Sequence, residues 1–218
     1  MDYKIIDIGD RLYPDSLKVI FDPPKRLYCV GDVSLLNEVG VAIIGCRNAS
    51  KYGIKIAKIF ADKLSKSGVT IISGFARGID SVSHLASYKN IGKTIAILGS
   101  GLDVIYPSEN EKLFYDIIEN GGLIISEFPF GTKPDKENFP KRNRIISALS
   151  KCVIVVEAKK KSGTMITVDC ALEQGKTVFA VPGNIDSLNS EGTNELIKQG
   201  AIPLTNYTDI FQFLRQVQ

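Results

Sequence analysis

Short runs of β-branched and other apolar residues alternate along the chain with longer segments whose apolar residues recur every three or four positions. The runs are VAIIGC (41–46), VTIIS (69–73), TIAIL (94–98), LIIS (123–126), VIVVE (153–157) and TVFAV (177–181). Near-continuous apolar strands that alternate with helices are typical of a parallel sheet covered on both faces and joined by right-handed crossovers. The pattern therefore predicts an α/β fold with a Rossmann-like, doubly wound and mainly parallel sheet that has helices on both faces.

The clearest helical segment is predicted from about Tyr52 to Ser67, just before Gly68. Its apolar residues share one face at helical spacing: Ala57, Phe60, Ala61 and Leu64. Near the C-terminus, residues 191–200 and the segment from about Asn206 onward predict two more helices.

The first part of the chain breaks this rhythm. It contains DPPKRLYCVGD, whose prolines and glycine interrupt a regular element. We expect residues 1–37 to form a helical and turn-rich extension packed on the edge of the sheet, and residues 38–218 to form the Rossmann-like domain.

Five turns that follow the predicted strands contain most of the residues that could bind a ligand. They are GCRNASKYG (45–53), SGFARGID (73–80), GSGLDVIYPSEN (99–110), EFPFGTKPDKENFPKRNR (127–144) and EAKKKSGT (157–164). Ligands of open α/β sheets bind beyond the carboxyl ends of the strands, so we expect all five turns to meet at one rim. The glycines of SGFARG and KSGT would let backbone N–H groups approach an anion closely.

Composition changes this picture only where the charge is concentrated. The chain has 218 residues, of which 44% are hydrophobic and 23% charged, and its net charge of +3 does not by itself indicate a nucleic-acid partner. Residues 133–161, however, contain nine lysines and arginines against three acidic residues, a local excess of six. The basic residues therefore gather around the fourth and fifth turns.

Membrane and metal-binding proteins are disfavoured. The N-terminal MDYKIIDIGD has acids where a signal peptide has basic residues, and no apolar run approaches the ~20 residues of a membrane span. We expect a cytoplasmic protein with no membrane span. The four cysteines are widely spaced and accompanied by one histidine, which favours small buried hydrophobes over a metal site.

Nucleotide-cofactor chemistry is also disfavoured. Each of the two GKT triplets lacks the earlier glycine of a P-loop, since Ser87 and Cys170 stand there, and GSGLDV lacks the third glycine of a dinucleotide fingerprint. Asp80 and His84 are four residues apart and resemble half of a catalytic triad, but such a pair more simply stabilises a helix N-terminus. We therefore expect no cofactor.

The stretch NFPKRNR (138–144) places three basic residues after a phenylalanine and a proline. Because Pro140 presets the φ of a first helical turn, we predict a helix from Pro140 through Leu149. Its spacing turns Arg142 toward the sheet, where an arginine at a helix N-terminus requires an acid or a ligand phosphate. Phe139, just outside this helix, fits either a base-stacking platform or a hydrophobic staple against the first turn.

Taken together, the turns resemble those of the DNA-processing protein A family (DprA, also called Smf). The resemblance rests on VAIIGCRNASKYG, IISGFARGIDSVSH, TIAILGSGLDVIYPSEN, LIISEFPFGT, NFPKRNRIISALS, VIVVEA, SGTMITVDCALEQGKTVFAVPG and EGTNELIKQGA. These motifs follow the order of the family and extend over about residues 10–205.

The resemblance implies a non-catalytic protein that binds incoming single-stranded DNA during natural transformation, protects it and helps to load the RecA recombinase. It also implies a homodimer formed through the C-terminal part of the Rossmann-like domain. By the same resemblance, the nucleic-acid-binding residues are Gly45, Arg47, Gly74, Arg77, Lys136, Phe139, Arg142, Asn143, Arg144, Ser162 and Gly163.

One alternative comes from an enzyme class. The LOG-type nucleotide phosphoribohydrolases share a related Rossmann-like core and bind phosphate with a PGGxGTxxE turn. Here SGTMIT (162–167) keeps the glycine and the threonine but lacks the paired glycines, and Thr167 stands where the glutamate is needed. The sequence therefore favours DNA binding over nucleotide hydrolysis.

Overall fold

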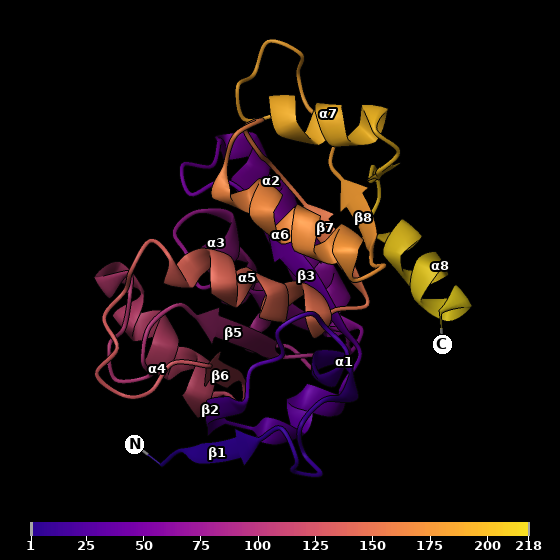
Figure 1. Ribbon diagram of the computed structural model, residues 1–218. Helices are drawn as coiled ribbons and strands as arrows, with labels where there is room; N and C mark the ends of the chain where they lie inside the picture. The colour runs from indigo at the N-terminus through magenta and orange to yellow at the C-terminus, as the bar shows by residue number, and fades with distance from the viewer. Residues whose placement is uncertain (1, 218) are drawn as a thin grey trace.

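The computed structural model describes residues 2–217, which form one mixed sheet with helices on both faces (Figure 1). The strands are β1 (Lys4–Asp7), β2 (Arg26–Gly31), β3 (Gly40–Ile44), β4 (Thr70–Ser73), β5 (Thr94–Leu98), β6 (Leu123–Ser126), β7 (Cys152–Val155), β8 (Thr177–Ala180) and β9 (Ile202–Pro203). The α-helices are α1 (Asp15–Lys18), α2 (Lys51–Lys66), α3 (Ile79–Ser87), α4 (Glu111–Glu119), α5 (Asn138–Ala148), α6 (Gly163–Glu173), α7 (Glu191–Lys198) and α8 (Thr208–Gln216), with short 3-10 helices η1 (Val33–Asn37) and η2 (Ser108–Asn110). The predicted α/β class is confirmed.

The order of the strands reverses at the centre of the sheet. The order is β1-β2-β6-β5-β4-β3-β7-β8-β9, so the chain adds β4, β5 and β6 on one side of β3 and then β7, β8 and β9 on the other. β3 and β7 pair in parallel, with Ala42 opposite Val153. In doubly wound sheets such a reversal opens a crevice at the carboxyl ends of the two strands, and ligands bind there.

Both faces of the central strands are covered, which explains their continuous apolar runs. Every residue of β3 to β7 is buried. Neighbouring residues point to opposite faces: Ile72 packs with the cluster that includes Ile145 of α5, and Ile71 packs with the cluster that includes Phe60 of α2. α5 and α6 therefore cover one face, and α2, α3 and α8 cover the other.

The N-terminal segment differs from its predicted character. The expectation of a helical and turn-rich extension was wrong in part, because this segment contributes β1 and β2 to the sheet. β2 pairs antiparallel with β6, and β1 pairs antiparallel with β2 at the outer edge. β1 has only four residues, two of them exposed, so it lacks the long apolar run that identified the central strands.

The other boundaries follow the sequence pattern closely, with one informative exception. β5 and β6 coincide with the predicted runs, and α2 begins one residue before the predicted Tyr52, where Oγ of Ser50 accepts a hydrogen bond from the N–H of Gly53 at 3.1 Å. α5, however, begins at Asn138 and not at Pro140. The proline lies in the first turn either way, where its missing N–H costs no intrahelical bond.

The cysteines behave as the predicted small hydrophobes. Cys29, Cys46 and Cys152 are buried, Cys170 is partly buried, and all four thiols are free. Across residues 2–217, no helix combines the length and the apolar character needed to span a bilayer.

Asp80 and His84 stabilise different parts of the fold and not each other. Oδ2 of Asp80 accepts hydrogen bonds from the N–H groups of Gly74 (3.2 Å) and Ala76 (3.4 Å), which holds the turn after β4. Nδ1 of His84 lies 2.8 Å from Oγ1 of Thr94 in β5. Burial lowers the pKa of His84 to about 3, and nearby Arg142 adds to the effect.

His84 should make the protein less stable as the pH falls from neutral to about 5. Because its pKa is about 3 in the fold and about 6.5 in the unfolded chain, the unfolded chain binds the extra proton between these values. The His84 contribution is therefore complete above pH ~6.5 and is lost as the pH decreases, by about 2 kcal/mol at pH ~5.

Urea unfolding of the wild type and of His84→Gln at neutral and at acidic pH measures this effect. Burial raises the pKa of Asp80, which acts in the opposite sense, but Asp80 is present in both proteins and its effect cancels in the comparison. The variant should lose less stability than the wild type on acidification. Equal losses would contradict the assignment to His84.

Candidate nucleic-acid interface

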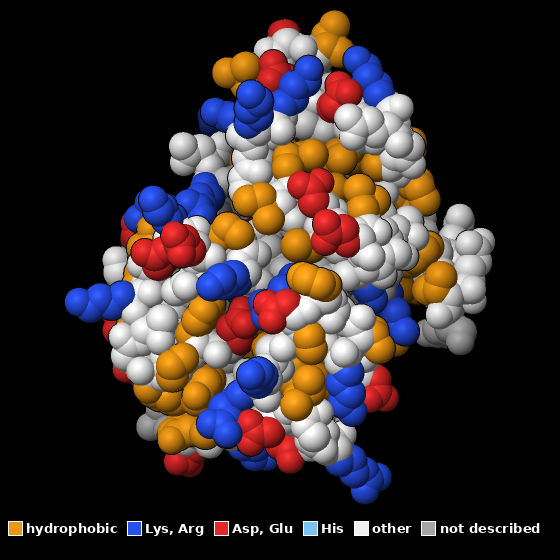
Figure 2. Space-filling model, in the orientation of Figure 1, with side chains coloured by type: hydrophobic (Ala, Val, Ile, Leu, Met, Phe, Trp, Pro, Cys, Tyr) orange, Lys and Arg blue, Asp and Glu red, His pale blue; other side chains and the backbone are white. Residues whose placement is uncertain are grey.

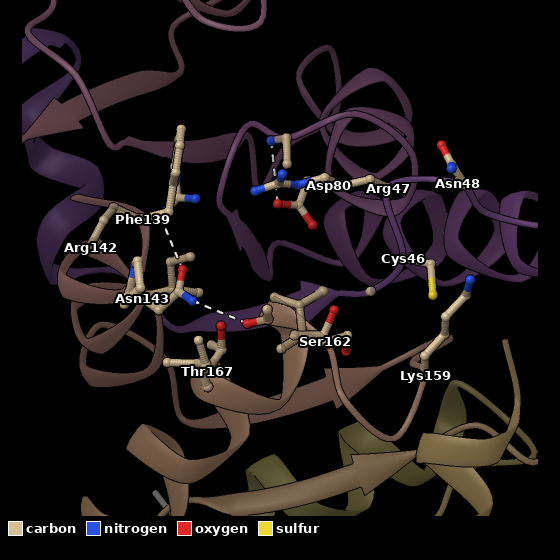
Figure 3. A pocket seen from close by; sticks show the side chains of 18 of the residues that line it. Cys46, Arg47, Asn48, Asp80, Phe139, Arg142, Asn143, Lys159, Ser162 and Thr167 are labelled. Carbon is tan, nitrogen blue, oxygen red and sulfur yellow. Dashed lines mark hydrogen bonds between the residues drawn. The ribbon is translucent and has the colours of Figure 1, made fainter. Parts of the chain in front are cut away.

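A cleft of about 660 Å³ opens at the carboxyl ends of β3 and β7. Its lining includes residues from each of the five turns that we expected to meet at one rim, such as Gly45, Asp80, Tyr106, Asn143 and Ser162. Figure 3 shows Phe139, Arg142 and Asn143 on one side of this cleft and Cys46, Asn48 and Lys159 on the other. The reversal of strand order thus creates the crevice, and the five turns supply its walls.

The structure brings most of the predicted binding residues together. Those that line the cleft are Gly45, Arg47, Lys136, Phe139, Arg142, Asn143, Ser162 and Gly163. Gly74 and Arg77 line a smaller pocket beside it, which Arg47, Phe139 and Arg142 also border. Arg144 lines neither.

Arg144 is directed away from the cleft. Its Nη1 and Nη2 donate to the two carboxylate oxygens of Glu127 at 2.6 and 2.8 Å, and its Nε donates to the carbonyl oxygen of Asp22 at 2.8 Å. The side chain is 14% exposed. Arg144 thus joins α5 to the end of β6 and to the N-terminal segment, and its guanidinium is not available to a ligand in the cleft.

Arg142 is buried and holds the turns of the cleft in place. Only 4% of the residue is exposed, Nη1 donates to the carbonyl oxygens of Gly74 and Ile97, and Nε donates to Oδ1 of Asn143 at 3.2 Å. Burial lowers the pKa of Arg142 to about 10, and the negative charge of Asp80 opposes this effect. The inward arginine therefore has the compensating acid that the sequence required, and it links the ends of β4 and β5 to α5.

The ring of Phe139 stands half-buried in the wall of the cleft. Cζ of Arg47 lies 5.4 Å from the ring centroid, Cζ of Arg142 lies 5.9 Å from it, and the ring of Tyr106 lies 5.8 Å away. A Cβ on Gly99 would come within 2.8 Å of the ring, so only glycine lets the ring approach this turn. Because Phe139 lies inside the first turn of α5, it cannot be the staple residue that precedes a helix, and that alternative was wrong.

Glu157 fixes the first turn of the cleft to the end of β7. The residue is buried, and its carboxylate accepts hydrogen bonds from the N–H of Ser50 at 2.9 Å, from the hydroxyl of Ser50 and from Nδ2 of Asn189 at 3.4 Å. A Cβ on Gly53 would lie 2.4 Å from this carboxylate. The sequence reasoning missed this role, although an acid that ends the apolar run VIVVE was a visible signal.

Sequence reasoning also missed several residues that line the cleft: Asn48, Tyr106, Lys159, Thr167 and Asn189. The aromatic ring in YPSEN was the available signal for Tyr106, and the basic run KKK was the signal for Lys159. Asn189 follows β8 and comes from outside the five turns, so no local motif pointed to it.

The cleft carries exposed positive charge. Arg47, Lys136 and Lys159 are exposed, and none of the three forms an ion pair within the part of the chain that the structure describes. Arg77 is also exposed and pairs with Glu109. Figure 2 shows further Lys and Arg side chains along the left and upper edges of the face that it displays, with acidic side chains among them. Anionic ligands are therefore favoured.

These features define a class: an α/β protein with a Rossmann-like sheet and a basic, aromatic-lined cleft where the strand order reverses. The family model for DNA recombination-mediator protein A matches residues 4–215. The chain belongs to this family.

Known relatives support the assignment over nearly the whole chain. The chain is 44% identical to Protein Smf of Escherichia coli K12 across 98% of its own length and 57% of the relative's. It is 42% identical to DNA processing protein A (DprA) from Streptococcus pneumoniae, whose X-ray structure has a TM-score of 0.91, with 97% of this chain and 74% of the other covered.

A third comparison concerns a relative with a described ligand. DNA processing protein A from Helicobacter pylori was solved in work on its single-stranded DNA binding mode. It is 35% identical to this chain with a TM-score of 0.89, and the match covers 99% of this chain and 97% of the H. pylori chain. The chain spans little more than half the length of the E. coli relative.

Proposed function

We propose that this chain binds single-stranded DNA in the cleft, protects incoming DNA during natural transformation and helps to load the RecA recombinase. One observation carries the proposal: a half-buried ring, Phe139, stands in a basic cleft with the guanidinium of the exposed Arg47 over it. The likeness to the H. pylori protein over almost all of both chains supports the same ligand.

Binding would combine phosphate contacts with base stacking. Arg47, Lys136 and Lys159 offer exposed positive charge to the backbone phosphates. Phe139 would stack one base, a contact worth ~1 to 3 kcal/mol that tolerates any sequence. A single strand is favoured because the stacked bases of a duplex have no free face for the ring.

Arg47→Ala should weaken single-stranded DNA binding roughly 10-fold or more, because a charge-assisted hydrogen bond to a phosphate is worth about 1.5 to 3 kcal/mol. The log–log salt slope should become shallower by about 0.7, the value for one phosphate on a single strand. Fluorescence anisotropy with an oligothymidylate over a range of salt concentrations measures both quantities.

Lys141→Ala is the matched control. It removes one positive charge from the exposed side of α5 and does not line the cleft. It should leave affinity and slope close to those of the wild type. If both variants lose the same affinity, the effect comes from overall charge, and the assignment of Arg47 to the site is wrong. A competition with duplex DNA in the same assay tests the preference for single strands.

The proposal requires no chemical step. A nucleotide hydrolase of the LOG type needs a carboxylate three residues after Thr164, and the residue there is Thr167, which lines the cleft. Incubation with nucleoside monophosphates should therefore release no free base. Release of base that depends on Asp80, which also lines the cleft, would favour an enzyme.

The assembly and the cellular role are further parts of the proposal. We infer a homodimer through the C-terminal part of the domain, because two clefts on one long strand gain avidity. Sedimentation that finds only monomers, with and without DNA, would contradict it. The role also requires a cytoplasmic location. It further requires contact with RecA, which a binding assay between purified RecA and the complex of this protein with DNA tests.

A further inference from the structure

A second, smaller pocket of about 40 Å³ adjoins the cleft. Three arginines line it, Arg47, Arg77 and Arg142, and no acidic side chain among residues 2–217 does so. The rings of Phe139 and Tyr106 also border it. The pocket therefore gathers three guanidinium groups next to the proposed stacking ring, of which Arg142 has Asp80 nearby and Arg77 pairs with Glu109.

The size of this pocket limits what can enter. A water molecule requires about 10 to 15 Å³, so the pocket accommodates about three groups of that size, which suits a phosphoryl group and is too small for a base or a nucleoside. Gly74 lets Arg142 pack closely at this pocket, and Gly99 does the same for the ring of Phe139. A Cβ on Gly74 would lie 2.8 Å from Oδ2 of Asp80 and 2.9 Å from the guanidinium of Arg142, and one on Gly99 would lie 2.8 Å from the ring of Phe139.

The three arginines have donors to spare. The guanidinium of Arg47 and Nη2 of Arg142 make no hydrogen bond to any other residue that the structure describes. Arg77 uses Nη2 to pair with Glu109, and both side chains of this pair are more than half exposed. Exposed ion pairs of this kind are weak, so a phosphate can compete with Glu109 for Arg77.

The charge and the small size of the pocket favour the end of a strand over its interior. A phosphodiester within a strand carries one negative charge and continues on both sides. A terminal phosphate monoester carries close to two charges at neutral pH and three oxygens that accept hydrogen bonds. A pocket with three guanidinium groups and room for one phosphoryl group matches the terminal group.

We propose that this pocket binds the terminal phosphate monoester of a DNA strand, so that the protein prefers strands with a phosphorylated end. The inference rests on the proposed binding of single-stranded DNA in the adjoining cleft. The chemistry is the same for a 5′ and a 3′ phosphate, and the experiment separates the two.

The test is a competition in which an internally labelled oligothymidylate is displaced by unlabelled short oligothymidylates. These carry hydroxyl groups at both ends, a 5′ phosphate or a 3′ phosphate. A phosphate at one end or the other should improve competition about 10-fold, because charged hydrogen bonds are gained. Equal competition by all three overturns this inference and leaves the proposed function standing. Failure of the labelled strand to bind at all overturns both.

Variants of the Arg77 pair locate the effect. Arg77→Ala should reduce the ratio between phosphorylated and unphosphorylated competitors to about twofold or less, because one of three guanidinium groups is lost. Glu109→Gln should increase the ratio, since it releases Arg77. Arg26→Ala is the matched control: Arg26 is an exposed arginine paired with Asp7 away from both pockets, and its loss should leave the ratio unchanged. An unchanged ratio in Arg77→Ala would overturn the inference.

Discussion

Replacing Phe139 with alanine should weaken binding of single-stranded DNA by about 1 to 3 kcal/mol, or roughly 5- to 150-fold, with little change in salt dependence. The ring is half-buried in the cleft wall, so its loss removes a stacking surface and no charge. The salt slope counts the phosphates that the protein neutralises, and Phe139 neutralises none. Anisotropy titrations across a salt series separate the two effects.

Phe130→Ala is the matched control for this prediction. Phe130 belongs to the same long turn and is 40% exposed, but it packs against Tyr3 and Tyr28 outside the cleft. This variant should bind as the wild type does. If Phe139→Ala makes the slope shallower by about 0.7, the ring acts through a phosphate contact and the stacking role is wrong.

Arg142→Ala should lower the free energy of unfolding by about 3 to 5 kcal/mol, since removal of one member of a buried charge pair leaves the other uncompensated. The carbonyl oxygens of Gly74 and Ile97 would lose their donor, and Asp80 would lose the nearby positive charge. Urea unfolding followed by circular dichroism measures the loss. The ends of β4 and β5 would also lose their link to α5, so DNA binding should fall in the same variant.

Two comparisons isolate the cause. Arg47→Ala removes the same kind of side chain from the same cleft, but Arg47 is exposed, and the free energy of unfolding should change by no more than about 0.5 kcal/mol. Adding Asp80→Asn to Arg142→Ala should recover part of the loss, because the two residues interact. Equal stability of the Arg142 and Arg47 variants would show that burial of Arg142 contributes nothing.

The sequence predicted the central architecture because one physical signal dominates it. Strands such as Thr94–Leu98 are covered on both faces, so every position is apolar or small, and the run is easily distinguished from the 3.6-residue period of Lys51–Lys66. Lys4–Asp7 carries no such signal. It is covered on one face only and lies at the edge, and its pairing depends on a partner distant in the chain.

The site was predictable where local spacing decides the outcome. Helical spacing in NFPKRNR directed Arg142 toward the sheet, and the structure buries it there. Spacing could not reveal the partners. Arg144 lies two residues further on and is held by Glu127, which directly follows β6 and lies 17 positions earlier in the chain.

The parts that required tertiary information are the supports of the cleft. Glu157 contacts Ser50, which lies 107 positions away in the chain, and Asn189 completes the same network. The compensation of Arg142 by Asp80 likewise joins α5 to α3. A single sequence can mark one residue of such a pair, as the acid at the end of VIVVE does, but it contains no local signal for the partner.

Hydrogen exchange with mass spectrometry, with and without an oligothymidylate, shows whether single-stranded DNA occupies the cleft. If single-stranded DNA lies in the cleft, backbone amides of residues 45–50, 74–78, 134–143 and 159–165 should exchange more slowly when DNA is bound. Amides of Lys4–Asp7 and of the exposed side of α4 should be unaffected, because they lie outside the cleft lining. Protection confined to those outer regions, with none in the four cleft segments, would show that DNA binds elsewhere on the protein.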